Sequence, residues 1–336
     1  MEERGEAVNV LHLNRFFYSG QTTHVFSLVC EQKKQGINAF LIMDGYPSNQ
    51  AMAMYKGTMN ELGAAIIKPG DSTALVRHIE GKQIHLIHAH SSLTYPVANS
   101  LAEKLRIPYV VTCHGLGLNK QEYRPFFRNA RFIICISPRV ADTMREYAHK
   151  VYIIPNGVDL NEFKPGVKEK PVKIAFIARM DHTKQKGYNQ FCKAVDLLED
   201  VEFYVAANKN PNSQTAEYLG WTNEIAPLLS QTDIVAGTGR AILEGMAAGN
   251  AAMILGRTYQ GILTPEKAAK QRFLDVSGLS GSDPCYRDIF FDLTKLLQNT
   301  NYIRQLQKFG RELVKREFDN EAHTARIIEI YNKIFD

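Results

Sequence analysis

Short apolar runs alternate with longer helix-like segments over most of this chain, and this alternation constrains its fold more than any other feature. The runs at 109–113, 132–136 and 172–178 are almost continuously apolar, which is typical of strands that are buried on both faces. A strand, a helix and a second strand in succession build a parallel sheet covered by helices. The sequence therefore predicts an α/β fold with parallel sheets.

The alternation occurs twice and is interrupted once. The first series of strands ends near residue 154 and is followed by a turn signal, Pro155-Asn156-Gly157. The segment 159–170 is polar and charged and reads as a linker, and a second series begins at residue 172. We therefore expect two open sheets, with ligands bound where the carboxyl ends of their strands meet in a cleft.

Composition places the chain among ordinary soluble globular proteins. Of its 336 residues 22% are charged, and the net charge of +5 is spread without a basic run, so no nucleic-acid partner is expected. Five scattered cysteines without zinc or C-x-x-C spacing predict reduced thiols and a cytoplasmic protein. The segment 1–4 does not resemble a signal peptide, and no apolar run approaches the ~18 residues of a membrane span.

One strand–loop–helix segment in the second half predicts a phosphate site. A short apolar strand leads into Gly237, Thr238 and Gly239, and a helix begins near Arg240. Glycines let the backbone approach a ligand, and free N–H groups at the start of a helix attract phosphate. Arg240 adds positive charge, and Glu244, one turn later, can accept hydrogen bonds from ribose hydroxyls. The alternative is a plain turn followed by a solvated Arg–Glu pair.

A second candidate is the basic loop after the strand 172–178. It contains Arg179, Lys184 and Lys186 and precedes Gly187. Cations just beyond the carboxyl end of a parallel strand suit a diphosphate. The alternative is a solvated basic loop without a ligand.

The first half offers histidines and a glycine at the ends of its strands. His88 and His90 lie near the end of one strand, and His114 follows the next. Because no acidic residue accompanies them at zinc-ligand spacing, no metal site is predicted, and His114 is expected to bond a substrate. Gly20, in the loop expected after the first strand, permits a tight turn that exposes backbone N–H groups, although a simple turn is the alternative.

The segment 123–131 combines three arginines with three bulky aromatic residues. Such a segment can contact anionic lipid headgroups, so weak peripheral contact at the inner membrane face is one expectation. The favoured alternative is a helix that packs its phenylalanines into the first domain while its arginines face water.

Several motifs occur in a family's order along most of the chain. The run 153–159 (Ile-Ile-Pro-Asn-Gly-Val-Asp), followed by Phe163, is similar to an interdomain signature. The segments 112–115 (Thr-Cys-His-Gly) and 244–249 (Glu-Gly-Met-Ala-Ala-Gly) are similar to two further motifs of the same family. Together they resemble the retaining glycosyltransferases of family 4, whose GT-B fold consists of two Rossmann-like domains with parallel sheets facing across a cleft.

This resemblance implies a domain organisation. Residues 1–158 would form the Rossmann-like acceptor-side domain, and 159–170 the linker. Residues 171–318 would form the Rossmann-like nucleotide-sugar domain. A C-terminal helix in 319–336 would pack back toward the first domain.

The resemblance also implies roles for individual residues. Arg179 and a lysine of the next loop would hold the donor diphosphate, with Lys186 preferred to Lys184 because it precedes Gly187. His114 would contact the donor sugar and Glu244 the ribose. The further residues implied to bind the donor are Gly20, Gly237, Thr238, Gly239 and Arg240.

Two positions depart from the family pattern. The family has a second glutamate eight residues before the ribose-binding one, and this chain has Ala236 there. Arg240 also stands where the family has an apolar residue. We interpret both as a variation of the loop, although loss of the carboxylate could impair transfer.

The function implied is metal-independent transfer of a hexosyl unit, with retention, from a nucleoside-diphosphate sugar to an acceptor hydroxyl. The donor would be a UDP- or GDP-hexose, no cofactor would be needed, and the pathway would be synthesis of cell-surface polysaccharide or glycoconjugate. The acceptor would be a glycan, a lipid-linked sugar or a protein, and the sequence leaves the oligomeric state open. Two alternatives are a GT-B sugar-nucleotide epimerase and a non-catalytic nucleotide-sugar-binding protein.

Overall fold

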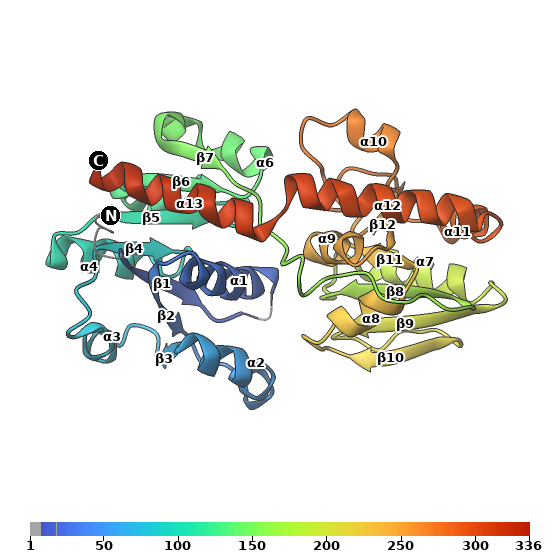
Figure 1. The fold of residues 1–336 in the computed structure, drawn as a ribbon, viewed down its shortest axis with the longest axis horizontal. Coiled ribbons are helices and arrows are strands. Elements are labelled where there is room, and N and C mark those ends of the chain that lie inside the picture. The colour runs from blue at the N-terminus through green and yellow to red at the C-terminus, as the bar shows by residue number, and fades with distance from the viewer. Residues whose placement is uncertain (1–7, 18) are drawn as a thin grey trace, which may run out of the picture. The chain divides into compact units, whose positions relative to one another are not determined.

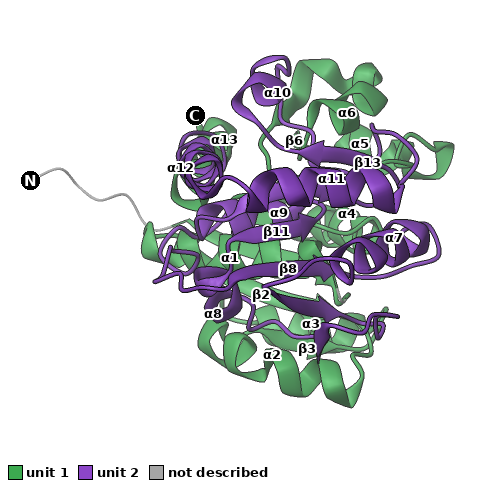
Figure 2. Cartoon of the chain, turned by 90° about the vertical axis from the view of Figure 1, so that its right-hand side faces the viewer, with its two compact units in different colours: residues 1–157, 320–336 green, residues 158–319 purple. Residues whose placement is uncertain are grey.

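The computed structural model describes residues 8–17 and 19–336, so the segment 1–4 lies outside the described residues. The chain divides into two compact units (Figure 2). Unit 1 comprises residues 1–157 and 320–336, and unit 2 comprises residues 158–319. Each unit contains one sheet with helices on both of its faces (Figure 1).

Unit 1 contains a seven-stranded parallel sheet in the order β3-β2-β1-β4-β5-β6-β7. Its strands are β1 (Asn9–Arg15), β2 (Asn38–Asp44), β3 (Ala65–Ile67), β4 (Leu86–Ala89), β5 (Tyr109–Cys113), β6 (Phe132–Cys135) and β7 (Val151–Ile153). Its helices are α1 (Gly20–Lys34), α2 (Asn49–Leu62), α3 (Ser72–Ile79), α4 (Tyr95–Leu105), α5 (Arg124–Asn129), α6 (Pro138–Ala141) and α13 (Asn320–Phe335), with short 3₁₀ segments at Gln121–Tyr123 and Asp142–Lys150.

Unit 2 contains a six-stranded sheet in the order β10-β9-β8-β11-β12-β13, of which only β13 is antiparallel. Its strands are β8 (Val172–Ala178), β9 (Val201–Ala207), β10 (Ala216–Gly220), β11 (Ile234–Gly237), β12 (Ala251–Leu255) and β13 (Tyr259–Ile262). Its helices are α7 (Gln185–Val195), α8 (Ala226–Gln231), α9 (Arg240–Ala247), α10 (Pro265–Ala269), α11 (Tyr286–Leu297) and α12 (Thr300–Glu317).

Both sheets have an apolar layer on each face, as the continuous apolar runs predict. In unit 1 the core residues divide between a layer that includes Leu101 of α4 and a layer that includes Val25 of α1. In unit 2 the two layers include Phe191 of α7 and Leu243 of α9. The predicted α/β fold with parallel sheets is therefore confirmed.

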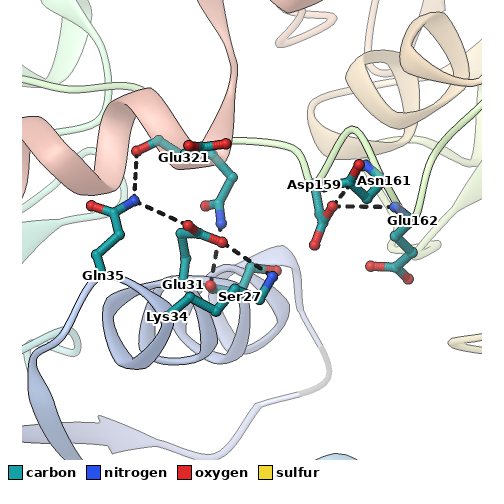
Figure 3. Close-up of polar contacts among 9 residues, drawn as sticks. Ser27, Glu31, Lys34, Gln35, Asp159, Asn161, Glu162 and Glu321 are labelled. Carbon is teal, nitrogen blue, oxygen red and sulfur yellow. Dashed lines mark hydrogen bonds and ion pairs between the residues drawn. The ribbon is translucent and has the colours of Figure 1, made fainter.

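The last helix, α13, belongs to unit 1 and packs against α1. Ile327, Ile330 and Tyr331 are buried in the same core layer as Val25. Figure 3 shows Gln35, which caps the end of α1, donating to Glu31 Oε1 and to the carbonyl oxygen of Glu321, both at 3.0 Å. The apolar face of α13 and the hydrogen bond from Gln35 to Glu321 both hold this helix on unit 1.

The segment predicted as a linker, 159–170, is part of unit 2. Asp159 accepts hydrogen bonds from the backbone N–H groups of Asn161 and Glu162 at 2.8 and 3.2 Å (Figure 3). Phe163 is buried in the apolar layer that covers α9, and Arg311 of α12 donates to its carbonyl oxygen at 2.6 Å. The polar composition predicted a linker because Phe163 is the one buried residue of this segment, and a single apolar residue gives no recognisable pattern.

Some sequence predictions of local structure differ from the structure. Ser137 followed by Pro138 predicts a capped helix over 138–147. The structure has a four-residue α-helix followed by a 3₁₀ segment, and Ser137 caps it by accepting from Val140 N–H at 3.3 Å. The helix α2 and the strands β10 and β13 were not predicted. In the segment 123–131, Phe127 is buried and Phe126 partly buried, while Arg124 and Arg128 are exposed, which is the arrangement of the packing alternative.

Candidate functional site

In the sheet of unit 2, the side on which the chain adds successive strands reverses between the parallel neighbours β8 and β11. From β8 the chain builds outward through β9 to β10, and from β11 it builds outward on the other side. Ligands of open α/β sheets bind beyond the carboxyl ends of the strands at such a switch point. Two of the predicted segments lie there, because Arg179 directly follows β8 and Gly239 follows β11.

Gly237 allows the ends of these two strands to approach each other closely. Its φ angle is +153°, and an added Cβ would lie 2.4 Å from the carbonyl oxygen of Ile177 in β8. Any side chain would therefore clash with backbone. Gly239 has a φ angle of +61° and donates its N–H to the Val276 carbonyl oxygen at 2.7 Å, so that N–H group is already bonded within the protein.

Arg240 and Glu244 of α9 form a buried ion pair. Nε and Nη2 of Arg240 lie 2.8 and 2.6 Å from Oε1 of Glu244, and the two side chains are only 10% and 5% exposed. Burial raises the pKa of the Glu244 carboxyl, and the Arg240 guanidinium opposes this increase. The alternative of a solvated pair is therefore wrong, and both of these contacts end on Oε1 of Glu244.

The turn that follows the interdomain signature lies beside this ion pair. Glu162 keeps solvent contact, but partial burial and the Glu244 carboxylate raise its pKa, while Arg240 lowers it. Sequence reasoning did not select Glu162, because a charged residue in a polar segment is usually solvated. The structure thus places a second carboxylate near Arg240.

Ala236 does not occupy a ligand-facing position. It is an interior residue of β11, fully buried in the apolar layer with Phe176 and Met253. A glutamate at this position would be buried in that core. At this position the chain therefore has apolar packing where the family has a carboxylate, at the end of a strand that runs directly into the Gly237–Gly239 loop.

The loop after β8 separates its two lysines. Lys184 folds back so that its Nζ donates to the Arg179 carbonyl oxygen at 3.3 Å, and burial lowers its pKa. Lys186 lies in the first turn of α7, where it is exposed and contacts Asp283. Of the two candidates, only Lys184 lies against the end of β8.

Two residues that sequence reasoning missed shape this loop. Asn208 accepts from Met180 N–H at 2.5 Å and donates to the Met180 carbonyl at 3.2 Å, which fixes the turn after Arg179. Asp181 accepts from Thr183 N–H and Oγ1–H at 2.8 and 2.6 Å, and these bonds lower its pKa. An Asp two residues before a Thr is the signal for such a turn.

Unit 1 has its own switch point, between β1 and β4. Gly20 is the first residue of α1 there, so the expectation that it lies in a loop before the helix is wrong. A pocket with a volume of about 210 Å³ opens at this edge. Its polar lining includes Gln21, His90, Ser91 and His114, and exposed apolar side chains of Phe17, Leu93 and Leu116 surround it.

Five histidines of unit 1 form a continuous group behind and along this pocket. The ring centroids of His88 and His90 lie 4.0 Å apart, those of His12 and His90 5.2 Å, and those of His90 and His114 5.8 Å. His24 lies 5.4 Å from His114. The sequence places His88, His90 and His114 at strand ends, but only the register of β1 against β4 brings His12 to His88.

Burial keeps the rings of His12, His88, His90 and His114 neutral. It lowers the pKa of His12 to about 4 and that of His114 to about 3. The pKa values of His88 and His90 lie well below the ordinary value, first because of burial and then because of repulsion by the neighbouring histidines. Neutral histidines both donate and accept hydrogen bonds, as the next contacts show.

Hydrogen bonds connect this group to α13. His12 Nε2 lies 2.7 Å from Gln32 Oε1, and Gln32 Nε2 donates to Tyr331 Oη at 3.0 Å. The Tyr331 hydroxyl lies 2.6 Å from His88 Nδ1, and His88 Nε2 lies 2.7 Å from Thr112 Oγ1. His88 is therefore a structural residue inside the sheet.

In the described part of the chain, one ligand atom each from His12, His88 and His90 can lie within 4.8 Å of the others, the spacing of a metal site. Both nitrogens of His88 and Nε2 of His12 already bond to protein groups, and His12 Nδ1 lies 2.9 Å from His90 Nε2. A metal ion would have to break this network. The arrangement is that of a hydrogen-bonded cluster.

Comparisons with known proteins agree with the motifs. Residues 18–162 match the model of Glycosyltransferase Family 4. The chain is 22% identical over 303 residues to an uncharacterized glycosyltransferase of Bacillus subtilis, YqgM, with 78% of this chain and 82% of YqgM aligned.

Solved structures share the fold at low sequence identity. The structure of HepE of Anabaena in complex with UDP and glucose matches with a TM-score of 0.69 at 14% identity, over 97% of this chain and 100% of HepE. The UDP-GlcNAc 2-epimerase of Neisseria meningitidis, bound to UDP-GlcNAc, matches with a TM-score of 0.66 at 13% identity, over 97% and 100% of the chains. The motifs and the match over residues 18–162 make this chain similar to Glycosyltransferase Family 4, and the solved structures show that it has their GT-B fold.

Proposed function

We propose that the protein transfers a hexosyl unit, with retention, from a UDP- or GDP-hexose to an acceptor hydroxyl. The observation that carries this proposal is the convergence of Arg179, Lys184 and the Arg240–Glu244 pair at the switch point of unit 2. Cations at the ends of parallel strands suit a diphosphate, and the Glu244 carboxylate can accept a ribose hydroxyl. The complexes of HepE with UDP and glucose support a donor of this kind.

In this proposal the protein stabilises the leaving nucleoside diphosphate electrostatically. Negative charge develops on the diphosphate as its bond to the sugar breaks, and Arg179 and Lys184 supply fixed positive charge for it. Two of the acidic groups nearby are already engaged, Asp181 with Thr183 and Glu244 with Arg240, and the third, Glu162, lies beside that ion pair. We therefore propose that the reaction needs neither a metal nor a cofactor.

The proposal is tested by calorimetric titration with UDP, GDP and their hexose derivatives. A bound donor also raises the melting temperature by mass action. If no nucleotide in the panel binds, the proposal fails. The matched variant is Glu244→Gln, which keeps the side-chain volume and loses the charge.

The acceptor and setting are also proposed. The acceptor would be a glycan, a lipid-linked sugar or a protein, in synthesis of cell-surface polysaccharide or glycoconjugate. The reaction would take place in the cytoplasm. Among the described residues, no helix is long and apolar enough to cross a membrane.

The epimerase remains the second candidate because an epimerase shares this fold. Incubation with a nucleotide sugar alone decides between them, since an epimerase yields a new sugar nucleotide without any acceptor. The non-catalytic alternative, suggested by Ala236 in place of the family glutamate, predicts donor binding without transfer in the same titrations.

A further inference from the structure

The pocket of unit 1 contains polar atoms that have no hydrogen-bond partner. Nδ1 of His90 and both ring nitrogens of His114 are buried without a partner in the described structure. Both side chains line the pocket, and His90 is only 1% exposed. An unsatisfied buried polar group costs about 1–3 kcal/mol, so a ligand that bonds these atoms would recover that energy.

The hydrogen bonds behind the pocket determine which His90 nitrogen carries the proton. With the Gln32 amide oriented as in the structure, Oε1 can only accept, so His12 Nε2 is the donor at 2.7 Å. A neutral His12 then accepts at Nδ1, which makes His90 Nε2 the donor across 2.9 Å. His90 Nδ1 is left with a free lone pair.

The Gln32 orientation is itself fixed by α13. Its Nε2 group donates to Tyr331 Oη at 3.0 Å, and the Tyr331 hydroxyl is then free to donate to His88 Nδ1 at 2.6 Å. His88 Nε2–H donates in turn to Thr112 Oγ1 at 2.7 Å. Reversing the Gln32 amide would exchange donor and acceptor in every hydrogen bond of this network, and His90 Nδ1 would then be a donor.

The chemistry of the pocket restricts its ligand. None of the described residues that line it carries a charged side chain, and the two histidines are neutral. A carboxylate or phosphate placed there would lose its hydration without gaining a counter-charge. Hydroxyl groups would match the histidine nitrogens, and the apolar side chains of Phe17, Leu93 and Leu116 would cover the C–H faces of a sugar ring.

We propose that this pocket binds an uncharged sugar ring and that His90 Nδ1 accepts a hydrogen bond from one of its hydroxyls. In this proposal His12 and Gln32 are positioning residues that hold His90 in the Nε2–H tautomer. The inference rests on the proposed function, because it assigns a sugar of that reaction to unit 1. The sugar can belong to the donor or to the acceptor, since both present the same hydroxyl chemistry.

The tautomer that Gln32 and His12 impose on His90 is tested without any ligand, by ¹⁵N NMR of the histidine side chains in the wild-type protein. The expected result is the Nε2–H tautomer for both His12 and His90. The Nδ1–H tautomer for His90, or a positively charged ring at neutral pH, would overturn the proposal. Gln32→Leu removes the acceptor of His12 Nε2–H and is expected to give His90 a mixture of tautomers.

The sugar contact is tested by adding UDP, UDP-glucose, and UDP with D-glucose, and likewise GDP, GDP-mannose, and GDP with D-mannose. A change in the His90 Nδ1 resonance with a sugar nucleotide but not its nucleoside diphosphate assigns the pocket to the donor sugar. A change only with the free sugar assigns it to the acceptor. If calorimetry shows that a sugar nucleotide binds and the resonance changes in neither case, the contact is wrong, whereas absence of all nucleotide binding refutes the proposed function instead.

The kinetic test compares His90→Gln with His78→Gln. Gln at position 90 can still donate to His12 but lacks the Nδ1 acceptor, whereas His78 is an exposed residue of α3 in the same unit. His90→Gln is expected to lower kcat/KM for donor turnover about tenfold with an unchanged Kd for the nucleoside diphosphate. Equal kinetics for the two variants would overturn the proposal.

Discussion

At the residue scale, Arg240 and Glu244 show how a motif residue can be structural and ligand-binding at once. The pair is buried, and two charges removed from water are stable only while they face each other. Glu244 therefore depends on Arg240 to remain ionised. In this chain Arg240 is the group that makes a buried carboxylate tenable at the start of α9.

Replacing Arg240 with Met is expected to destabilise unit 2 strongly. Removing one partner of a buried ion pair costs about 3–5 kcal/mol, because the other charge is left unpaired. Trp221, the single tryptophan and part of unit 2, reports unfolding in urea by its fluorescence. Because burial already raises the pKa of Glu244, the loss should shrink as pH falls and this carboxyl takes up a proton.

The matched control is Lys315→Met, which breaks the exposed pair of Lys315 with Glu312 on α12. Exposed pairs contribute only about 0–1 kcal/mol. Similar losses for Arg240→Met and Lys315→Met would show that the buried pair has no special role.

A second prediction concerns the two lysines after β8. Lys184→Met is expected to weaken binding of a nucleoside diphosphate at least about tenfold, because a hydrogen bond to a charged group is worth about 1.5–3 kcal/mol. Lys186→Met serves as the control, since Lys186 is exposed beside Asp283. Calorimetric titration measures both, and a larger loss for Lys186→Met would restore the preference taken from the motif.

At the element scale, α13 is held by polar as well as apolar contacts. Its buried face carries Ile327, Ile330 and Tyr331, and the Tyr331 hydroxyl joins Gln32 of α1 to His88 of β4. The helix itself was expected within 319–336, and Asn320–Phe335 is a helix. The hydrogen bonds of this helix could not be predicted from the sequence, because they join residues that are 243 and 299 positions apart.

Tyr331→Phe should therefore destabilise unit 1 more than an ordinary tyrosine substitution. It leaves Gln32 Nε2–H and His88 Nδ1 unsatisfied in the interior, at a cost of about 1–3 kcal/mol. Thermal unfolding followed by far-UV circular dichroism measures the effect. Tyr46→Phe is the control because Tyr46 is 74% exposed, and an equal shift in Tm for both variants would argue against the network.

The elements missed by sequence reading share a physical cause. The edge strand β10 carries three exposed residues among its five, and β13 pairs antiparallel to β12. Edge and antiparallel strands lack the continuous apolar run that identifies buried parallel strands. The strands β5 and β8, buried on both faces, have the bounds predicted from their sequences.

At the scale of the whole molecule, the two units differ in the chemistry of their interiors. Unit 1 buries a cluster of neutral histidines, whereas the site of unit 2 is built from charged residues. The histidine pKa values are lowered by folding, so below the ordinary value of about 6.5 the unfolded chain binds more protons than the folded one. The stability of unit 1 is therefore present above pH 6.5 and decreases as pH falls toward about 4, the pKa of His12.

This predicts a lower urea midpoint at pH 5 than at pH 7, measured by far-UV circular dichroism. His12→Asn removes one of the titrating rings and is expected to reduce the shift. His182→Gln replaces an exposed histidine of unit 2 and is expected to leave the shift unchanged. A midpoint that does not move between pH 7 and pH 5 would contradict neutral burial of the cluster.

A further prediction for the whole protein concerns metal removal. If Arg179 and Lys184 neutralise the diphosphate, donor turnover should keep its rate in excess EDTA. The measurement compares turnover before and after dialysis against the chelator, with MgCl₂ restored in a second sample. A loss of activity that MgCl₂ reverses would contradict the proposed metal independence.

The sequence by itself determined the two α/β sheets, the positions of most buried strands and the loops that end at the carboxyl edges. These follow from local patterns, because burial on both faces of a strand requires a continuous apolar run. Only the tertiary structure decided that Lys184 rather than Lys186 lies against Arg179, that Ala236 faces the core and that His12 joins His88 and His90. Those outcomes depend on strand register and on contacts between distant residues, which no local pattern specifies.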